Sequence, residues 1–220
     1  GTSRRALIVV SGTGDRSEDP AASTAIAEAY VPAGAQAVTV ADAGAFRVGE
    51  RVVVRRPSTA EWIAHLGMNT FAGWRPEDRL HWQVGSRDVA WDRLVNAIDG
   101  PRLTLDAPLT TSIDRQFGGG SVSRYRFPGR IAQVGVEDLR LVSEHDATRP
   151  ADEDHAWFAV ALDKVEDGWV RRVSAWHFVS YVINAEADAR RLTVEDVDAR
   201  DPVSEVGGYR RRVFYTAGQQ

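Results

Sequence analysis

The second half of the chain carries a repeated pattern of apolar positions. Val136, Val170 and Val194 each begin the pattern V-x-x-[LV]-x-[LA], in which polar residues separate the apolar ones. The last two copies start 24 residues apart and the first two 34 residues apart, and a polar insertion over 144–154 accounts for the difference. Because a coil of a parallel β-helix takes about two dozen residues and buries its apolar face on its neighbours, the pattern predicts such coils.

Other short apolar runs extend the same prediction. Residues 157–162 and 181–185 lie between the repeats and read as further coil strands. The run 6–10, stopped by a Ser-Gly-Thr-Gly turn, predicts a coil strand near the start of the chain, and 213–215 predicts one near its end. With strands open at both ends, we expect these residues to be an interior piece of a larger β-helix, or else a compact domain with irregular caps.

The first half has the composition of a small antiparallel module. Strands are expected over 37–40, 51–55, 94–98 and 102–105, a helix over 59–66 capped by Ser58, and a loop over 15–22. A glycine triplet at 118–120 favours a boundary near residue 120. We therefore expect a coil strand and loop over 1–36, a β-rich insert over 37–120 and parallel coils over 121–220.

Composition narrows the classes of function. With 27 Lys and Arg against 31 Asp and Glu, the 220-residue chain carries a formal charge of −4, which argues against a general nucleic-acid or anionic-membrane binder. It has no cysteine, which excludes disulfides, thiolate nucleophiles and zinc–thiolate sites. No apolar run reaches the length of a membrane span. Seven tryptophans are many, and they predict either sugar-stacking platforms or ordinary core.

The second half resembles a known family. Residues 134–220 resemble the right-handed parallel β-helix proteins of the pectate-lyase-like superfamily, particularly a bacterial group of large secreted proteins, in the segments 134–141, 152–157, 168–171, 177–178 and 202–211. The first half looks like the β-rich insert of that group. The resemblance implies an all-β fold, with right-handed parallel β-helix coils and a small insert. It also implies a longer parent protein, extracellular or at the bacterial cell surface, that cleaves or binds polysaccharide.

One candidate site is the acidic segment Asp152-Glu153-Asp154-His155. Crowded carboxylates raise one another's pKa values, and a neighbouring imidazole acts as acid or base near neutral pH. The segment is therefore a candidate acid/base pair for cleaving a glycosidic bond, or a Ca²⁺ ligand set. The alternative is a solvated acidic loop in which His155 caps the strand that begins at Trp157.

Two further candidates follow along the chain. His177 ends a coil strand, and stacking of coils about 4.8 Å apart would bring it near Asp201 and Glu205, unless it is simply a packed core histidine. Arg210 and Arg211 follow a Gly-Gly turn on what reads as the last strand. A guanidinium pairs a uronate carboxylate in bidentate fashion, or alternatively fastens a corner by pairing with Glu205 or Asp201.

These candidates define two hypotheses. The first is a carbohydrate-active enzyme, a polysaccharide lyase or a glycoside hydrolase, with catalytic residues Asp154, His155, His177 and Arg210 and substrate contacts from Trp157, Asp201, Glu205 and Arg211. The second is a non-catalytic β-helix, such as a spike or surface scaffold that binds glycan. Both take a polysaccharide or oligosaccharide as partner, with a homo-oligomer or the rest of a longer chain as further expected partners and Ca²⁺ as the candidate cofactor.

Overall fold

A computed structural model describes residues 4–75, 77–208 and 210–218. The chain divides into two compact units. The first, called here the coil unit, comprises residues 1–15 and 127–220, and the second, the insert unit, comprises 16–126. The two units are described separately. These boundaries, 15/16 and 126/127, differ from the sequence-based ones at 36/37 and 120/121. The difference arises because the strands over 17–25 and 121–126 pair with each other inside the insert unit.

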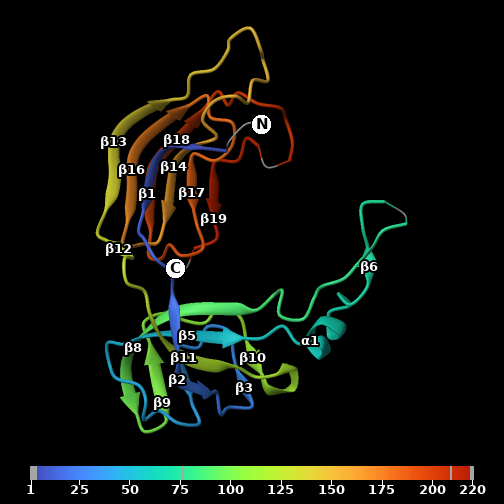
Figure 1. Cartoon of the computed structure of the whole chain (residues 1–220), viewed down its shortest axis with the longest axis vertical. Coiled ribbons are helices and arrows are strands. Elements are labelled where there is room, and N and C mark those ends of the chain that lie inside the picture. The colour runs from blue at the N-terminus through green and yellow to red at the C-terminus, as the bar shows by residue number, and fades with distance from the viewer. Residues whose placement is uncertain (1–3, 76, 209, 219–220) are drawn as a thin grey trace. The chain divides into compact units, whose positions relative to one another are not determined.

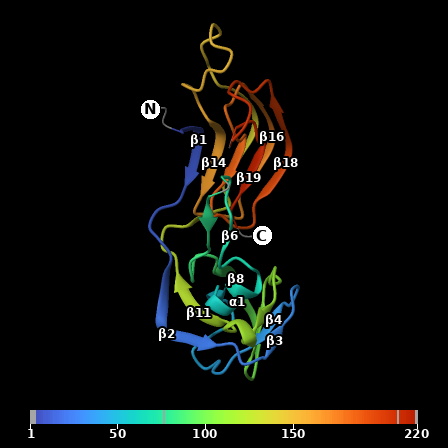
Figure 2. The ribbon, with the colours of Figure 1, turned by 90° about the vertical axis from the view of Figure 1, so that its right-hand side faces the viewer.

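The coil unit stacks its strands in parallel on three faces. One face is the sheet β1 (Ala6–Ser11), β14 (Phe158–Asp163), β17 (Ile183–Ala185) and β19 (Phe214–Thr216), in that order. The second is β13 (Gly135–Val142), β16 (Trp169–Trp176) and β18 (Thr193–Arg200). The third is short, with β12 (Ile131–Ala132), β15 (Val165–Glu166) and a bridge from Glu166 to Arg190. Figures 1 and 2 show the first two sheets side by side.

This arrangement confirms the predicted parallel β-helix coils and the all-β fold. Val136 lies opposite Val170, and Val170 opposite Val194, so the repeated pattern is the register of the stack. The inward side chains of the two long sheets form one core, which includes Val136, Val160, Leu162, Val170 and Ile183. Burial of each apolar rung on the next is therefore what holds the coils together.

Non-glycine residues with positive φ recur in the same register in successive coils. Asp138, Arg172 and Asp196 occupy equivalent positions within β13, β16 and β18, with φ of 59°, 49° and 52°. Gln133, Asp167 and Arg191 do the same at the corner that precedes these strands. Since an isolated left-handed residue is unfavourable for most side chains, its recurrence shows that each coil copies the backbone path of the last.

The insert unit is built on a six-stranded antiparallel sheet, as predicted. Its order is β2 (Ser17–Ala25), β11 (Ser121–Arg126), β5 (Arg51–Arg56), β8 (Val89–Asp99), β9 (Arg102–Leu105) and β4 (Ala37–Thr39). The prediction of a loop over 15–22 is wrong, because β2 forms an edge strand from Ser17 onward. Pro20 is tolerated at that edge, where β11 is the only neighbouring strand and the register shifts between Ser123 and Tyr125.

Shorter elements complete the insert unit. They are β3 (Tyr30–Val31), paired with β10 (Ile113–Asp114), the 3₁₀ helix η1 (Arg115–Phe117), and a hairpin of β6 (Phe71–Ala72) and β7 (Arg79–Leu80). Helix α1 (Ala60–His65) confirms the expected helix, but its cap is Thr59, whose hydroxyl accepts from the Trp62 amide. The predicted cap Ser58 instead donates its hydroxyl and its amide to Asp88. Within the described residues, no helix is long and apolar enough to cross a membrane.

The chain leaves the coil unit for the insert and returns to it at one place, where Gly12 and Gly129 lie next to each other. In one coil, the single residue Lys164 connects β14 to β15. In the preceding coil, the equivalent connection, from β1 to β12, contains the whole insert. Gly12 donates to the Asp163 carbonyl, and Thr13 donates to the Gly129 carbonyl. A Cβ on Gly12 would stand 2.4 Å from the Gly129 oxygen and 2.7 Å from the Lys164 oxygen. Only glycine therefore permits this approach.

We expect Gly12→Ala to lower the free energy of unfolding of the coil unit by about 2 kcal/mol or more, because backbone atoms rather than a flexible side chain must move. Denaturant unfolding followed by circular dichroism measures it. Gly44→Ala is the matched control, since its Cβ would meet only the Asp42 carboxylate, at 3.1 Å. Equal effects of the two substitutions would contradict the prediction.

Candidate functional site

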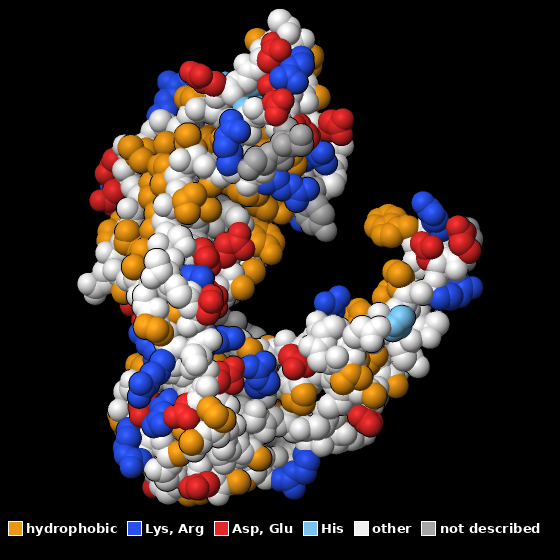
Figure 3. Space-filling model, in the orientation of Figure 1, with side chains coloured by type: hydrophobic (Ala, Val, Ile, Leu, Met, Phe, Trp, Pro, Cys, Tyr) orange, Lys and Arg blue, Asp and Glu red, His pale blue; other side chains and the backbone are white. Residues whose placement is uncertain are grey.

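The predicted site residues gather on one corner of the coil unit. Three loops, called here the third-corner loops, connect β13 to β14, β16 to β17 and β18 to β19; they span 143–157, 177–182 and 201–213, with residue 209 outside the described residues. Because the coils stack in register, these loops lie above one another. Acidic and basic side chains crowd over this end of the unit (Figure 3). All eight candidate residues belong to these loops.

Asp152 organises the first loop. Its side chain is 4% exposed; one carboxylate oxygen accepts from the Asp146 amide at 2.9 Å and the other from the Asp154 amide at 3.1 Å. Arg149 adds an ion pair at 2.7 Å. These backbone hydrogen bonds, followed by the charges of Arg149 and His155, hold the pKa of Asp152 below its usual range. Asp152 is therefore a buried, ionised anchor.

His155 ties two of the loops together. It is 3% exposed, and its Nε2 lies 3.1 Å from the Asp152 carbonyl and 3.2 Å from the Val203 carbonyl, so Nε2 carries the proton. The Ser143 hydroxyl lies 2.7 Å from Nδ1 and also accepts from the Ala156 amide. Both ring nitrogens are thus engaged by loop groups. The alternative, a solvated loop in which His155 caps a strand at Trp157, differs from this geometry, because His155 is buried and β14 begins at Phe158.

His177 is placed differently, because it is only half-buried. It has a φ of 67°, and its Nδ1 lies 3.0 Å from the Asp201 carbonyl, which fixes the proton on Nδ1 and makes Nε2 the acceptor. The ring of His145 lies 4.9 Å from that of His177 and 5.7 Å from that of His155. Sequence reasoning missed His145, which lies inside the polar insertion and had no motif to mark it.

Arg210 pairs with Glu153, not with Asp154. One edge of the guanidinium donates to both oxygens of the Glu153 carboxylate, through Nε and through Nη2 at 2.8 Å, and Glu153 also accepts from the Glu205 amide. This pairing holds the pKa of Glu153 below its usual range and raises that of Arg210. The Asp154 side chain is exposed. Arg210 thus fastens the two loops to each other, but its partner is Glu153 and not Glu205 or Asp201, the acids that the alternative named.

The remaining candidates have structural contacts too. Trp157 is 3% exposed, with the guanidinium carbons of Arg4 and Arg210 at 4.7 and 5.6 Å from its ring. Arg211 donates to the backbone carbonyl and hydroxyl of Ser204, and the last strand, on which Arg210 and Arg211 were expected, begins after them at Phe214. Asp201 contributes its backbone carbonyl to His177, and Glu205 its amide to Glu153.

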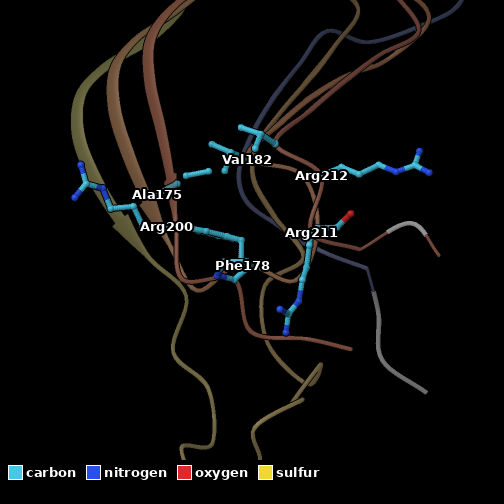
Figure 4. Close-up of a pocket in the computed structure, with 10 residues that line it drawn as sticks. Ala175, Phe178, Val182, Arg200, Arg211 and Arg212 are labelled. Carbon is cyan, nitrogen blue, oxygen red and sulfur yellow. The ribbon is translucent and has the colours of Figure 1, made fainter. Parts of the chain in front are cut away.

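A cavity of about 70 Å³ lies beside these loops. Its wall includes Ala175, Phe178 and Val182 together with Arg200, Arg211 and Arg212. In Figure 4 the guanidinium ends of the three arginines point away from the apolar side chains. The cavity is therefore apolar, and it is too small for a sugar ring.

The acidic segment does not suit Ca²⁺. The oxygens of Asp152 accept from backbone amides and Arg149, and those of Glu153 from Arg210, so neither carboxylate offers a vacant ligand pair. Among the described residues, no group of three or more His, Asp or Glu side chains could hold a metal ion.

The outer face of β13, β16 and β18 presents a second arrangement, called here the Trp176 face. Trp176 points outward from β16, between Val142 and Arg200 in register. The guanidinium carbons of Arg140 and Arg200 lie 5.0 and 5.3 Å from its ring centroid. Its indole donates to Ser174 at 2.9 Å. A partly exposed indole is thus held in place with cations on neighbouring coils.

Hydrogen bonds fix the polar groups of the same face. The Ser174 hydroxyl donates to Asp198 at 3.2 Å, and Arg200 pairs with the same carboxylate oxygen at 2.6 Å. These contacts lower the pKa of Asp198, with Arg200 as the leading cause. Arg140, Ser174 and Asp198 lie in one register row. Alternation along the predicted strands places these side chains outward, and that signal was available in the sequence.

The coil unit and the insert unit together define the class of protein: a parallel β-helix with an antiparallel insert between β1 and β12. No protein-family model matches the chain, and no curated protein matches it either. Among solved structures it is similar to the tailspike gp49 of Pseudomonas phage LKA1 (14% identity, TM-score 0.42, covering 87% of this chain and 27% of that one). It is also similar to the gp54 tailspike of Acinetobacter baumannii bacteriophage AP22, solved in complex with A. baumannii capsular saccharide (9%, 0.36, 87% and 35%).

A third similar structure is the tailspike gp61 of Pseudomonas phage phi297 (14% identity, TM-score 0.32, covering 90% of this chain and 33% of that one). The chain spans about a third or less of the length of these proteins. At this level of identity and superposition, function has to be derived from the site itself.

We expect Asp152→Asn to destabilise the coil unit at neutral pH, because the amide cannot accept from both backbone N–H groups and loses the pairing with Arg149. A carboxyl whose pKa is lowered on folding stabilises above its unfolded value, about 3.9, and that stabilisation is lost as pH falls through the lower folded value. The difference in Tm between variant and wild type should therefore shrink on acidification. Asp154→Asn, at the exposed neighbour, is the control; a pH-independent Tm difference for Asp152→Asn would contradict the prediction.

Proposed function

We propose that this chain is a glycan-binding β-helix segment and that its binding surface is the Trp176 face. The observation that carries the proposal is an outward indole with two guanidinium groups beside it and a fixed Ser174–Asp198–Arg200 hydrogen-bond chain. The proposed ligand is a polysaccharide or oligosaccharide, and the protein would act outside the cell or at a cell surface.

The chemistry of the face suits a sugar. Indole rings pack against the C–H groups of a pyranose, and side-chain dipoles held by prior hydrogen bonds receive hydroxyls without a further ordering cost. In-register stacking repeats the spacing of coils, about 4.8 Å, so a chain of sugars can run across the strands and meet equivalent rows. The cations Arg140 and Arg200 favour a saccharide that carries negative charge.

The third-corner loops support binding better than catalysis. The Asp152 and Glu153 carboxylates, the His155 imidazole and the Arg210 guanidinium are engaged with one another or with backbone groups. Of the residues predicted to be catalytic, His155 and Arg210 therefore supply rigidity to the third-corner loops.

Trp176→Ala should weaken binding of an acidic polysaccharide about tenfold, because a tryptophan at the centre of a binding surface commonly contributes at this scale. The measurement is isothermal titration calorimetry on the full chain with a panel of polysaccharides. Since Trp176 lies on the outer face, circular dichroism should show the fold retained.

The matched control is Trp74→Ala in the insert unit, whose side chain is fully exposed. It should leave binding unchanged. Loss of binding in Trp74→Ala but not in Trp176→Ala would overturn the assignment of the face, and no binding by the wild type to any member of the panel would overturn the proposed function.

A second candidate function, polysaccharide cleavage, is favoured by one observation. His177 is half-buried and carries its proton on Nδ1, so its Nε2 is an acceptor suited to a general base. If the chain cleaves polysaccharide, His177→Gln should reduce the rate about 100-fold or more while glycan affinity is retained. Ultraviolet absorbance of an unsaturated product identifies a lyase, and new reducing ends without it identify a hydrolase. Absence of both products leaves the binding function alone.

A further inference from the structure

The insert unit contains a cavity that the proposed function does not use. It has a volume of about 210 Å³ and lies where the end of β5, helix α1 and the segment around η1 meet. Besides Trp62 and Phe117, the residues that line the cavity are polar or charged: Arg56, His65, Thr111, Ser112 and Asp114. A space of this size takes a single monosaccharide-sized group rather than a larger ligand.

Arg56 is a buried cation without a matching hydrogen bond. The residue is 8% exposed, and its Nε has no hydrogen-bond partner among the described residues. Its guanidinium carbon lies 4.3 Å from the Trp62 ring centroid. A buried guanidinium normally has a carboxylate or several carbonyl oxygens around it, since burying an unpaired charge is costly.

Asp88, the acid whose charge acts on Arg56, does not fill that role. Asp88 influences Arg56 through its charge, but its Oδ1 accepts from the Ser58 amide at 2.7 Å and the Ser58 hydroxyl at 2.9 Å. Burial lowers the pKa of Arg56, and the charge of Asp88 only partly opposes this. Since Arg56 also lines the cavity, its guanidinium has capacity to pair with an anionic group there.

The rest of the wall restricts what that anion can be. Thr111 and Ser112 supply hydroxyls, which exchange hydrogen bonds with the hydroxyls of a ligand. Asp114 faces the same space, with its Oδ1 held by the Gln116 amide at 2.8 Å as the cap of η1. Its negative charge opposes dianions such as phosphate and tolerates a single negative charge paired with Arg56.

We propose that this cavity binds the carboxylate of a uronic acid, either as a free sugar acid or as one residue of an acidic saccharide. Arg56 pairs with the carboxylate, and Thr111 and Ser112 bind ring hydroxyls. Trp62 holds the guanidinium in place, because its ring also packs against Trp82 with centroids 5.9 Å apart. This site lies in the insert unit and does not depend on the Trp176 face.

The test is a two-dimensional ¹H–¹⁵N NMR titration of the full chain that follows arginine Nε–H and tryptophan indole signals. The Arg56 signal is assigned by its loss in Arg56→Gln, and the Trp62 signal by its loss in Trp62→Phe. Glucuronate should shift both signals saturably with a millimolar Kd. Glucose, which has no carboxylate, and inorganic phosphate, which is largely a dianion at about pH 8, where the titration is run, should each bind at least about tenfold more weakly.

Matched variants separate binding from folding. Arg56→Gln should weaken glucuronate binding at least about tenfold. Arg55→Gln, at the neighbouring residue that pairs with Glu18 at 2.6 Å, should leave it unchanged. Asp114→Asn keeps a residue that can cap η1, and it should tighten glucuronate binding several-fold and let phosphate bind.

Several results of this titration would contradict the proposal. No saturable shift of the Arg56 signal, equal affinity for glucose, or tighter binding of phosphate than of glucuronate would each overturn the proposal. So would weaker glucuronate binding in Asp114→Asn, a variant that does not rely on removing a buried side chain. Because Trp176→Ala leaves this cavity untouched, it should not alter the titration, so failure here and failure of the Trp176 face are distinguishable.

Discussion

Every feature of the coil unit depends on one constraint, the in-register stacking of parallel coils. A coil can bury its apolar side chains only if the next coil follows the same backbone path, including its left-handed residues at Asp138, Arg172 and Asp196. Once that path is shared, residues many positions apart in sequence are held about 4.8 Å apart. The Trp176 face and the third-corner loops are both products of this alignment, one on the strands and the other where the strands turn.

Stacking also explains the use of charge in this unit. Arg172 pairs with Asp138 at 2.6 Å, Arg171 with Glu195 at 2.9 Å, and Arg191 with Asp167 at 2.6 Å, each between neighbouring coils. Such exposed pairs contribute little stability individually, but they disfavour a slipped register that would place like charges opposite each other. In the insert unit, Arg56 differs from these residues because it is buried and lacks such a partner, which is why its surroundings indicate a ligand.

Much of this fold is predictable from the sequence, because apolar periodicity reports burial directly. Val136, Val170 and Val194 predicted the register, and the short strand near Ala6 was recognised as part of the same stack. The site is less predictable, since loop residues have no period. Asp154 and His155 are adjacent in sequence, yet the partner of Arg210 is Glu153, and His155 bonds to Ser143 and to two backbone carbonyls. Those choices are made by contacts between loops on different coils, which a linear pattern does not contain.

The close approach of Gly12 and Gly129 has a consequence for how such a chain can diversify. The insert begins and ends at one point on the first coil, at the corner that the next coil closes with Lys164 alone. A segment whose two ends meet in this way adds no length to the path along the stack. Its sequence and size can change by exchange of the whole insert while every coil keeps its neighbours. The coil unit is in this sense a constant frame for an exchangeable insert.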